Sequence, residues 1–185
     1  LNALALSTNV TARAQAAGAV NTLQFLENEI HGDNTDGIGL IEDIQKNLGY
    51  SLQGKKILLL GAGGAARGVL LPLLQCAPVA IFIANRTAEK ARQLAIEFAP
   101  LSSTTKIEAG SIAQAPSGYD VLINASAAGL NGHVPLLAKD CWSFELVYDM
   151  MYGDQATPFL QYAAASGAQT ADGLGMLVMQ AAHSF

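Results

Sequence analysis

The sequence predicts an α/β fold, a doubly wound parallel sheet with helices on both faces, and three observations support this prediction. Strand-like apolar runs alternate with helix-like segments through most of the chain after residue 50. The strand-like runs, such as KKILLLGAG at 55–63 and VAIFIANR at 79–86, are continuously apolar at their centres, as in strands buried on both faces. Hydrophobic residues make up 51% of the 185 positions, which is enough for a substantial core.

Three elements are expected before the alternating segment. They are an Ala-rich helix at 2–17, a hairpin at 19–34 that turns at 27–29, and a helix at 37–49 that ends near Gly49. The alternation then predicts strands at 55–63, 79–86, 119–126 and 144–152, and helices at 64–76, 87–98, 157–167 and 173–185. Pro72 lies inside the helix expected at 64–76, where it removes a backbone hydrogen bond at a cost of about 3 kcal/mol and should kink the helix. The polar segment 100–106 is expected to be a connection.

Charge and cysteine content narrow the classes of partner. The formal net charge is −5 and the ten Lys and Arg residues are scattered, which disfavours nucleic acid and anionic membranes. The longest apolar runs are short and interrupted by glycine, so none is expected to span a bilayer. Cys76 and Cys141 are far apart, with no CxxC pair and no histidine at metal-ligand spacing. They are interpreted as reduced core cysteines of a cytoplasmic protein, and no metal site is expected.

The segment LLLGAGGAARG contains a G-x-G-x-x-A pattern formed by Gly61, Gly63 and Ala66, between an expected strand and an expected helix. In such a turn the first glycine permits the tight bend, the second lets the backbone approach a pyrophosphate, and the small third residue allows close packing. The helix N-terminus then offers free N–H groups to phosphates. The pattern indicates a Rossmann-like dinucleotide site, although a glycine-rich turn without a ligand is the alternative. The residues assigned to the cofactor here are Gly61, Ala62, Gly63, Gly64 and Ala65.

The tip of the second strand, ANRTAEK, bears on the choice of cofactor. Sites for NAD usually carry Asp or Glu there to accept from the ribose 2′-hydroxyl, and this tip carries Asn85 and Arg86 instead. Arg86 could pair with a 2′-phosphate, Thr87 could cap the next helix and donate its hydroxyl, and Lys90 lies one turn further on. The alternative is a solvated Arg and Lys on a surface helix. We therefore predict a preference for NADP(H) over NAD(H).

The stretch HGDNTDGIGL, residues 31–40, places Asn34, Thr35 and Asp36 just before an expected helix. Such residues form turns, and Thr or Asp often caps a helix. A plain cap is one interpretation, and a functional carboxylate at Asp36 is the other.

Several segments together resemble the shikimate dehydrogenase family. They are AGAVNTL, GDNTDGIGL, LLLGAGGAARGVLLPLL, ANRTAEKA, DVLINAS, YDMMY and ADGLGMLVMQAAHSF, in the family's order and over nearly the whole chain. The resemblance implies reversible reduction of 3-dehydroshikimate to shikimate, with NADPH carrying the hydride. The expected partners are therefore this small-molecule substrate pair and NADP(H).

The resemblance also implies roles for individual residues. Asp36 matches a catalytic carboxylate in the cleft between two domains, and Asn21, Tyr152 and Gln180 match substrate-binding positions. Met150 and Gly173 match positions that border the nicotinamide. From the residues alone, Gln180 could be a satisfied amide and Asn21 a turn residue, Ser126 is left without a preference, and His183 is assigned no catalytic role.

The chain also departs from the family's pattern. The family's Ser-rich motif is absent, and NVT at 9–11 is followed by ARAQ rather than by the Pro and Lys of NVTxPxK. We therefore expect a fragment with a remnant of the substrate domain and hinge helix at 1–50, an NADP-binding Rossmann domain at 51–172, and a helix at 173–185 that returns toward the substrate cleft. The resemblance pairs Asp36 with the lysine of that motif. With an ordinary pKa of about 4, Asp36 would be ionised at neutral pH and could not donate a proton. Turnover without the lysine is therefore expected to be low or absent. A homodimer, or association through exposed apolar surface, is also expected.

Two other functions stay open at this point. One is a non-catalytic NADP-binding module, which the missing lysine favours. The other is a quinate/shikimate dehydrogenase with looser cofactor choice, against which Arg86 and Thr87 argue.

Overall fold

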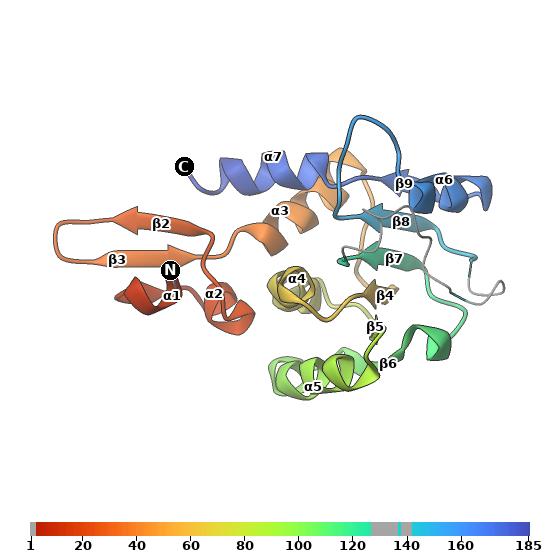
Figure 1. Cartoon of the computed structure of the whole chain (residues 1–185), viewed down its shortest axis with the longest axis horizontal. Coiled ribbons are helices and arrows are strands. Elements are labelled where there is room, and N and C mark those ends of the chain that lie inside the picture. The colour runs from red at the N-terminus through yellow and green to blue at the C-terminus, as the bar shows by residue number, and fades with distance from the viewer. Residues whose placement is uncertain (1–2, 127–136, 138–141) are drawn as a thin grey trace.

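A computed structural model describes residues 3–126, 137 and 142–185. Figure 1 shows a larger sheet with its helices, joined through helix α3 (Asp36–Glu42) to a smaller sheet near the N-terminus. Among the described residues, the two sheets contain six and three strands.

The larger sheet confirms the predicted fold class. Its strands are β4 (Lys56–Leu60), β5 (Ala80–Asn85), β6 (Lys106–Ser111), β7 (Val121–Asn124), β8 (Leu146–Asp149) and β9 (Gln169–Ala171). They pair in the order β6-β5-β4-β7-β8-β9, and every pair is parallel. The chain leaves β4 toward one edge for β5 and returns to the other side of β4 for β7. Ligands of such sheets bind in the crevice at this reversal, beyond the carboxyl ends of the strands.

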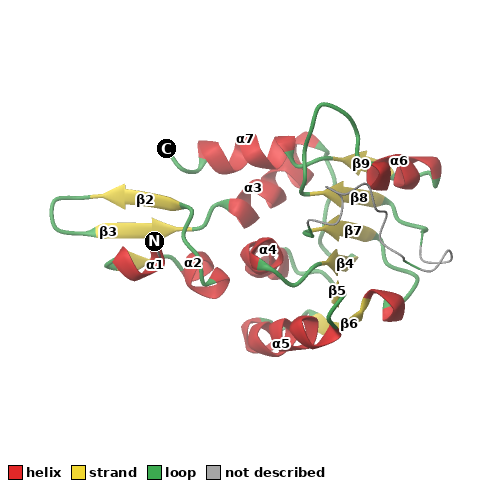
Figure 2. Cartoon of the chain, in the orientation of Figure 1, coloured by secondary structure: helices red, strands yellow, loops and turns green. Residues whose placement is uncertain are grey.

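Helices cover both faces of this sheet, as Figure 2 shows. The larger core cluster joins one face to α3, α4 (Gly64–Gln75), α5 (Ala88–Phe98) and α7 (Leu174–Ala182). The other cluster joins the opposite face to α6 (Pro158–Ala165) and to buried Trp142 and Phe144. Ile57 and Leu59 of β4 enter the first cluster and Leu58 and Leu60 the second, because successive side chains of a strand point to opposite faces.

The smaller sheet has the order β1-β3-β2, with β1 (Asn9–Val10), β2 (Thr22–Phe25) and β3 (Ile30–Asp33). The predicted hairpin is confirmed, since β2 and β3 pair in antiparallel fashion. The single helix expected at 2–17 was wrong. The segment forms α1 (Ala3–Leu6), the short strand β1 and α2 (Ala12–Ala17). The Thr11 side chain accepts from Ala14 N and starts a new helix, while Asn9 and Val10 pair in parallel with β3.

Two strands of the larger sheet were missed. The exposed fraction alternates along β6, because β6 lies at the edge of the sheet, so its segment lacks a continuous apolar run. β9 has only three residues. The connection expected at 100–106 holds a 3-10 turn, η2 (Ala99–Leu101), and ends where β6 begins, and another 3-10 turn, η3 (Ile112–Gln114), follows β6.

The hinge segment also differs from the expected single helix at 37–49. α3 passes at Asp43 into a π-helical turn, η1 (Asp43–Asn47), and Gly49 follows with a φ of 63°. Pro72 lies inside α4, and the kink expected there stays a prediction. Cys76 is a half-buried free thiol, whereas Cys141 lies outside the described residues. Within the described segments, no helix combines the length and apolar character that a membrane crossing would need.

Candidate functional site

The glycine turn after β4 has the geometry of a phosphate-binding turn. Gly61 has a φ of 112°, and a Cβ atom there would lie 2.9 Å from the Ala125 carbonyl oxygen. Gly63 occupies the N-cap position of α4 and offers no side-chain cap. A Cβ atom on Gly63 or Gly64 would meet no atom within 4 Å. The first N–H groups of α4 therefore adjoin open space at the positive end of a twelve-residue helix, a fit for an anionic group.

The tip of β5 presents positive charge beside this turn. Arg86, Thr87 and Lys90 are exposed, and Asn85 Nδ2 donates to the Thr87 carbonyl oxygen at 2.9 Å. No ion pair of Arg86 or Lys90 occurs within residues 3–126, 137 and 142–185. The cap expected from Thr87 was wrong, because Thr87 occupies the N-cap position of α5 but its side chain makes no capping bond. These cationic side chains are therefore available to an anion.

A second pair of assigned residues meets beyond the carboxyl end of β8. Met150 N donates to the Asn124 carbonyl oxygen at 3.0 Å, and Gly173 N donates to the Met151 carbonyl oxygen at 3.0 Å. A Cβ atom on Gly173 would overlap the Met150 carbonyl group. The structure thus brings Met150 and Gly173 together at the sheet edge where β4 and β7 end.

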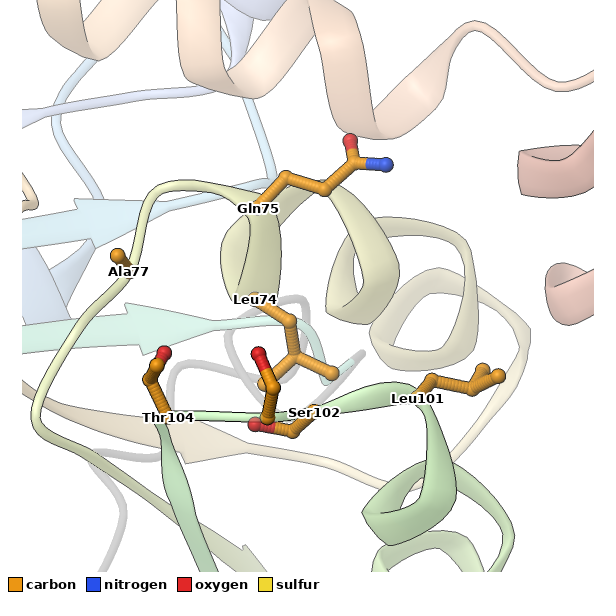
Figure 3. A pocket seen from close by; sticks show the side chains of 7 residues that line it. Leu74, Gln75, Ala77, Leu101, Ser102 and Thr104 are labelled. Atoms are coloured by element: carbon orange, nitrogen blue, oxygen red, sulfur yellow. The ribbon is translucent and has the colours of Figure 1, made fainter.

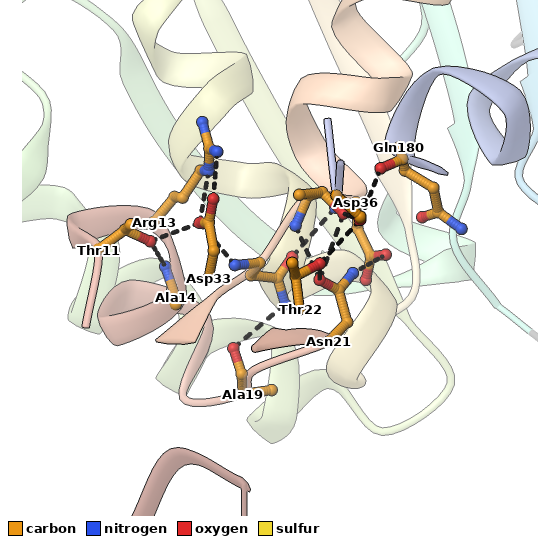
Figure 4. Close-up of polar contacts among 12 residues, drawn as sticks. Thr11, Arg13, Ala14, Ala19, Asn21, Thr22, Asp33, Asp36 and Gln180 are labelled. Carbon is orange, nitrogen blue, oxygen red and sulfur yellow. Dashed lines mark hydrogen bonds and ion pairs between the residues drawn. The ribbon is translucent and has the colours of Figure 1, made fainter. Parts of the chain in front are cut away.

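Asp36 lies in a polar cluster between the hairpin and the start of α3, drawn in Figure 4. Asn21 Nδ2 donates to Asp36 Oδ1 at 2.7 Å. Asn21 Oδ1 accepts from the Thr35 amide at 3.0 Å, which turns the Asn21 NH₂ group toward Asp36. The Thr35 hydroxyl, at 3.3 Å, and the Thr22 hydroxyl, at 3.0 Å, also donate to Asn21 Oδ1.

The cap at the start of α3 comes from a different residue than expected. Thr35 occupies the N-cap position but its side chain makes no capping bond. Asn34 Oδ1 instead accepts from Asp36 N at 3.2 Å, and Asn34 Nδ2 donates to the Ala19 carbonyl oxygen. The Asp36 carboxylate is therefore not used as a cap, and one of its oxygens faces Asn21.

Burial raises the pKa of the Asp36 carboxyl above its ordinary value, and the hydrogen bond from Asn21 opposes this shift. The expectation of an ordinary pKa at Asp36 was therefore wrong. The ion pairs among the described residues do not include Asp36.

Gln180 approaches this cluster from α7. A Cβ atom on Gly39 of α3 would lie 2.8 Å from Gln180 N and from Gln180 Cβ, so the two helices cross almost in backbone contact. Within the described part of the chain, Gln180 Oε1 is buried and has no hydrogen-bond partner. A buried acceptor without a partner is uncommon and indicates a place for a donor group.

The C-terminal turn of α7 is tied to the same cluster. Ser184 Oγ donates to the Gln180 carbonyl oxygen at 2.9 Å and lies 2.8 Å from Thr22 Oγ1. His183 Nε2 lies 3.1 Å from a carboxylate oxygen of Glu42, at the end of α3. Figure 4 shows Asn21, Asp36 and Gln180 gathered at the junction of the hairpin, α3 and α7.

Not every assigned residue joins these groups. Tyr152 follows β8, is 53% exposed, and makes no side-chain hydrogen bond among the described residues. From the sequence, buried Asn34 and Thr35 were expected only to form a turn or a cap, and Ser184 was given no role. The first two lie in the polar turn that the sequence marked, whereas Ser184 had no local signal.

A surface pocket of about 290 Å³ lies elsewhere on the molecule (Figure 3). It adjoins the end of α4 and the start of β6, at the amino ends of the parallel strands, whereas the glycine turn lies at their carboxyl ends. Ser102 in its lining already bonds the Thr105 backbone, as both donor and acceptor. The residues that line it are Leu74, Gln75, Ala77, Leu101, Ser102, Ser103 and Thr104. It contains none of the assigned site residues.

Comparisons with known proteins identify similar sequences and structures. Residues 42–133 match the family model described as shikimate / quinate 5-dehydrogenase. A shikimate dehydrogenase (NADP(+)) from Janthinobacterium sp. (strain Marseille) is 52% identical over all of this chain, which covers 67% of that protein. The chain therefore spans about two thirds of the length of this relative.

Solved structures are similar over the same extent. An Ael1 enzyme from Pseudomonas putida has a TM-score of 0.89 and 42% identity, covering 99% of this chain and 67% of that one. A shikimate 5-dehydrogenase from Thermus thermophilus, in complex with NADP(H) and shikimate, has a TM-score of 0.82 and 33% identity, with the same coverage of 99% and 67%.

Proposed function

The chain belongs to the shikimate dehydrogenase family, and we propose that it binds NADP(H) and acts in the reversible reduction of 3-dehydroshikimate to shikimate. One observation carries the cofactor proposal. The uncapped N-terminus of α4 lies at the carboxyl ends of the strands, where the strand order reverses. Arg86 lies at the same end of the neighbouring strand β5, and its guanidinium has no ion pair within the described residues.

Each part of NADP(H) has residues that would hold it. The free N–H groups of the turn Gly61–Ala65, at the start of α4, would donate to the pyrophosphate. Arg86, with Asn85, Thr87 and Lys90 around it, would hold the 2′-phosphate. Met150 and Gly173 would border the nicotinamide ring. NADPH supplies the hydride when bound, and the protein supplies binding and orientation.

The substrate proposal rests on the Asp36 cluster. Shikimate carries several hydroxyl groups, which need aimed donors and acceptors. Asp36 would accept from one hydroxyl, the second N–H of the Asn21 amide would donate to another, and the unpartnered Gln180 Oε1 would accept from a third. Tyr152 would contribute from the loop after β8.

We also propose that turnover by these 185 residues is low or absent. The family resemblance assigns a lysine partner to Asp36, and no lysine forms an ion pair with Asp36 in the described segments. Loss of a general acid or base typically lowers a rate about 10²- to 10⁴-fold.

NADPH and NADH fluorescence titrations of the chain test the cofactor proposal. We expect tighter binding of NADPH, and about tenfold weaker NADPH binding in Arg86→Ala, because a charge-assisted pair contributes about 1.5–3 kcal/mol before solvent screening. Arg92→Ala is the matched control, since Arg92 is exposed on α5 and faces Glu89. Equal affinity for the two dinucleotides, or equal losses in the two variants, would contradict the proposal.

Two alternatives make different predictions for the substrate. A non-catalytic NADP-binding module would bind NADPH but not shikimate, whereas the proposed function predicts shikimate binding by NMR titration even without turnover. A quinate/shikimate dehydrogenase with looser cofactor choice is the second alternative, since the family description includes quinate. Turnover of quinate with NAD⁺ would support it.

A further inference from the structure

The carboxyl group of Asp149, at the end of β8, is buried outside the proposed site. Its side chain and that of Asn124, at the end of the neighbouring strand β7, are both fully buried. No cation pairs with Asp149 in the part of the chain that the structure describes. Burial raises the pKa of Asp149, while hydrogen bonds from Thr157, Met151 N and Asn124 oppose the shift. Burying a carboxylate is unfavourable unless hydrogen bonds compensate for the lost water. The burial of Asp149 therefore needs an explanation.

The two carboxylate oxygens of Asp149 accept hydrogen bonds from the two ends of the loop that follows β8. Asp149 Oδ1 accepts from Met151 N at 3.2 Å, at the start of the segment 150–157 that joins β8 to α6. Asp149 Oδ2 accepts from the Thr157 hydroxyl at 2.9 Å, at the end of that segment. Thr157 Oγ1 also accepts from Leu160 N and so caps α6. One side chain therefore fixes both ends of the loop.

Asn124 joins this loop to the turn that follows β7. Asn124 Nδ2 donates to Asp149 Oδ1 at 3.0 Å, and Asn124 Oδ1 accepts from the Ser126 amide and hydroxyl at 3.1 and 2.6 Å. The Asn124 carbonyl oxygen accepts from Met150 N. The carboxyl ends of β7 and β8 are thus held together at Asn124, Asp149 and Met150, near the reversal of strand order.

We propose that Asp149, acting through Asn124 and Thr157, is a positioning residue that holds the loop 150–157 in the shape that receives the nicotinamide half of the cofactor. The loop carries Met150 and Tyr152, which the proposed function places beside the nicotinamide and the substrate, so the inference rests on that function. Asp149 itself is buried beneath the loop and does not touch the ligand.

The test compares two ligands that share one half. NADPH contains the nicotinamide, whereas 2′,5′-ADP contains only the adenosine with its 2′- and 5′-phosphates. In Asp149→Ala we expect NADPH to bind about tenfold more weakly, because binding must then order the loop, and 2′,5′-ADP to bind as in the unmodified chain. Asp149→Asn should retain NADPH affinity, because the amide oxygen can keep the bonds from Asn124 and Met151 while the Thr157 hydroxyl turns to accept from the NH₂ group.

A second pair of variants serves if Asp149→Ala does not fold. Thr157→Val removes the bond at the far end of the loop, together with the cap of α6, with little change in volume, and Thr157→Ser keeps both. We expect the NADPH-specific loss in Thr157→Val alone. Equal weakening of NADPH and 2′,5′-ADP, or unchanged NADPH affinity in Asp149→Ala and Thr157→Val, would overturn the inference.

Amide hydrogen exchange separates this inference from the proposed function. If the unmodified chain binds neither ligand, the cofactor proposal fails, but the loop can still be examined. Exchange at Met151 N and Ser126 N should be at least tenfold faster in Asp149→Ala than in Asp149→Asn. Equal exchange rates would refute the positioning role whatever the ligand results.

Discussion

The crossing of α3 over α7 at Gly39 gives a prediction that can be worked out in detail. A Cβ atom at this position would lie 2.8 Å from Gln180 N, from Gln180 Cβ and from the Met176 carbonyl oxygen. Two of these atoms belong to the backbone of α7, which cannot rotate away as a flexible side chain could. Gly39→Ala must therefore push the two helices apart.

The size of the effect follows from two opposing contributions. Overpacking a well-packed core typically costs about 1–3 kcal/mol. Alanine is favoured over glycine inside a helix by about 1 kcal/mol, which offsets part of this cost. Because two of the overlapped atoms are backbone, the overpacking cost should lie in the upper part of that range, at about 2–3 kcal/mol. After the gain from alanine, we expect the free energy of unfolding of Gly39→Ala to fall by about 1–2 kcal/mol, which for a chain of this size lowers Tm by about 2–8 °C.

Urea denaturation, followed by the fluorescence of buried Trp142, measures this change. The matched control is Gly64→Ala in the first turn of α4, where a Cβ atom would meet nothing within 4 Å. This control should be as stable as the unmodified chain or slightly more so. Because Gln180 moves with α7, Gly39→Ala should also weaken shikimate binding. If the two variants prove equally stable, the argument from the close helix crossing is refuted.

Three further predictions concern buried or half-buried polar groups. Tyr148→Phe removes the hydroxyl that donates to the buried carboxylate of Asp43 at 2.5 Å. The free energy of unfolding should fall by about 1–3 kcal/mol, and an unchanged urea midpoint would contradict this. Burial alone would raise the pKa of Asp33, but hydrogen bonds from Arg13, the Thr11 hydroxyl and Asn34 N hold this pKa below the ordinary value. A lowered carboxyl pKa stabilises the fold above the unfolded-state pKa, and this contribution disappears as the pH falls through the folded-state pKa. Arg13→Gln should therefore lower the urea midpoint at pH 7, and this effect should shrink as the pH falls well below the ordinary Asp pKa of about 4; an effect that does not change with pH would count against the ion pair. Asn21→Ala should raise the pKa of Asp36 further, as a ¹³C NMR titration would show, and a lower pKa would exclude the hydrogen bond between them.

Local sequence patterns predicted those parts of the fold whose cause is itself local. The strands β4, β5, β7 and β8 are continuous apolar runs, and each is buried in the larger sheet. The edge strand β6 escaped prediction because solvent on one side permits Lys106 and Glu108 within it. The helix expected at 2–17 failed because its alanine content outweighed the signal of Thr11, and because the pairing of β1 with β3 is a contact between residues far apart in the chain.

The sites divide in the same way. The glycine turn and Arg86 lie within one strand–turn–helix unit and the strand next to it, so their spacing could be read from the chain. The burial of Asp36, and with it the direction of its pKa shift, depends on elements from three parts of the sequence. The unpartnered Gln180 Oε1 and the bonds that Asp149 makes depend in the same way on tertiary packing.

The sequence by itself determined the class of the fold, the glycine turn and the cation at the tip of β5, because apolar periodicity and turn chemistry act over a few neighbouring residues. Only the tertiary structure decided which polar groups are buried, which oxygens find donors and which loops are held at both ends. The physical reason is that desolvation and hydrogen bonding depend on every group that surrounds an atom in space, and for Asp36, Asp149 and Gln180 those groups come from distant parts of the chain.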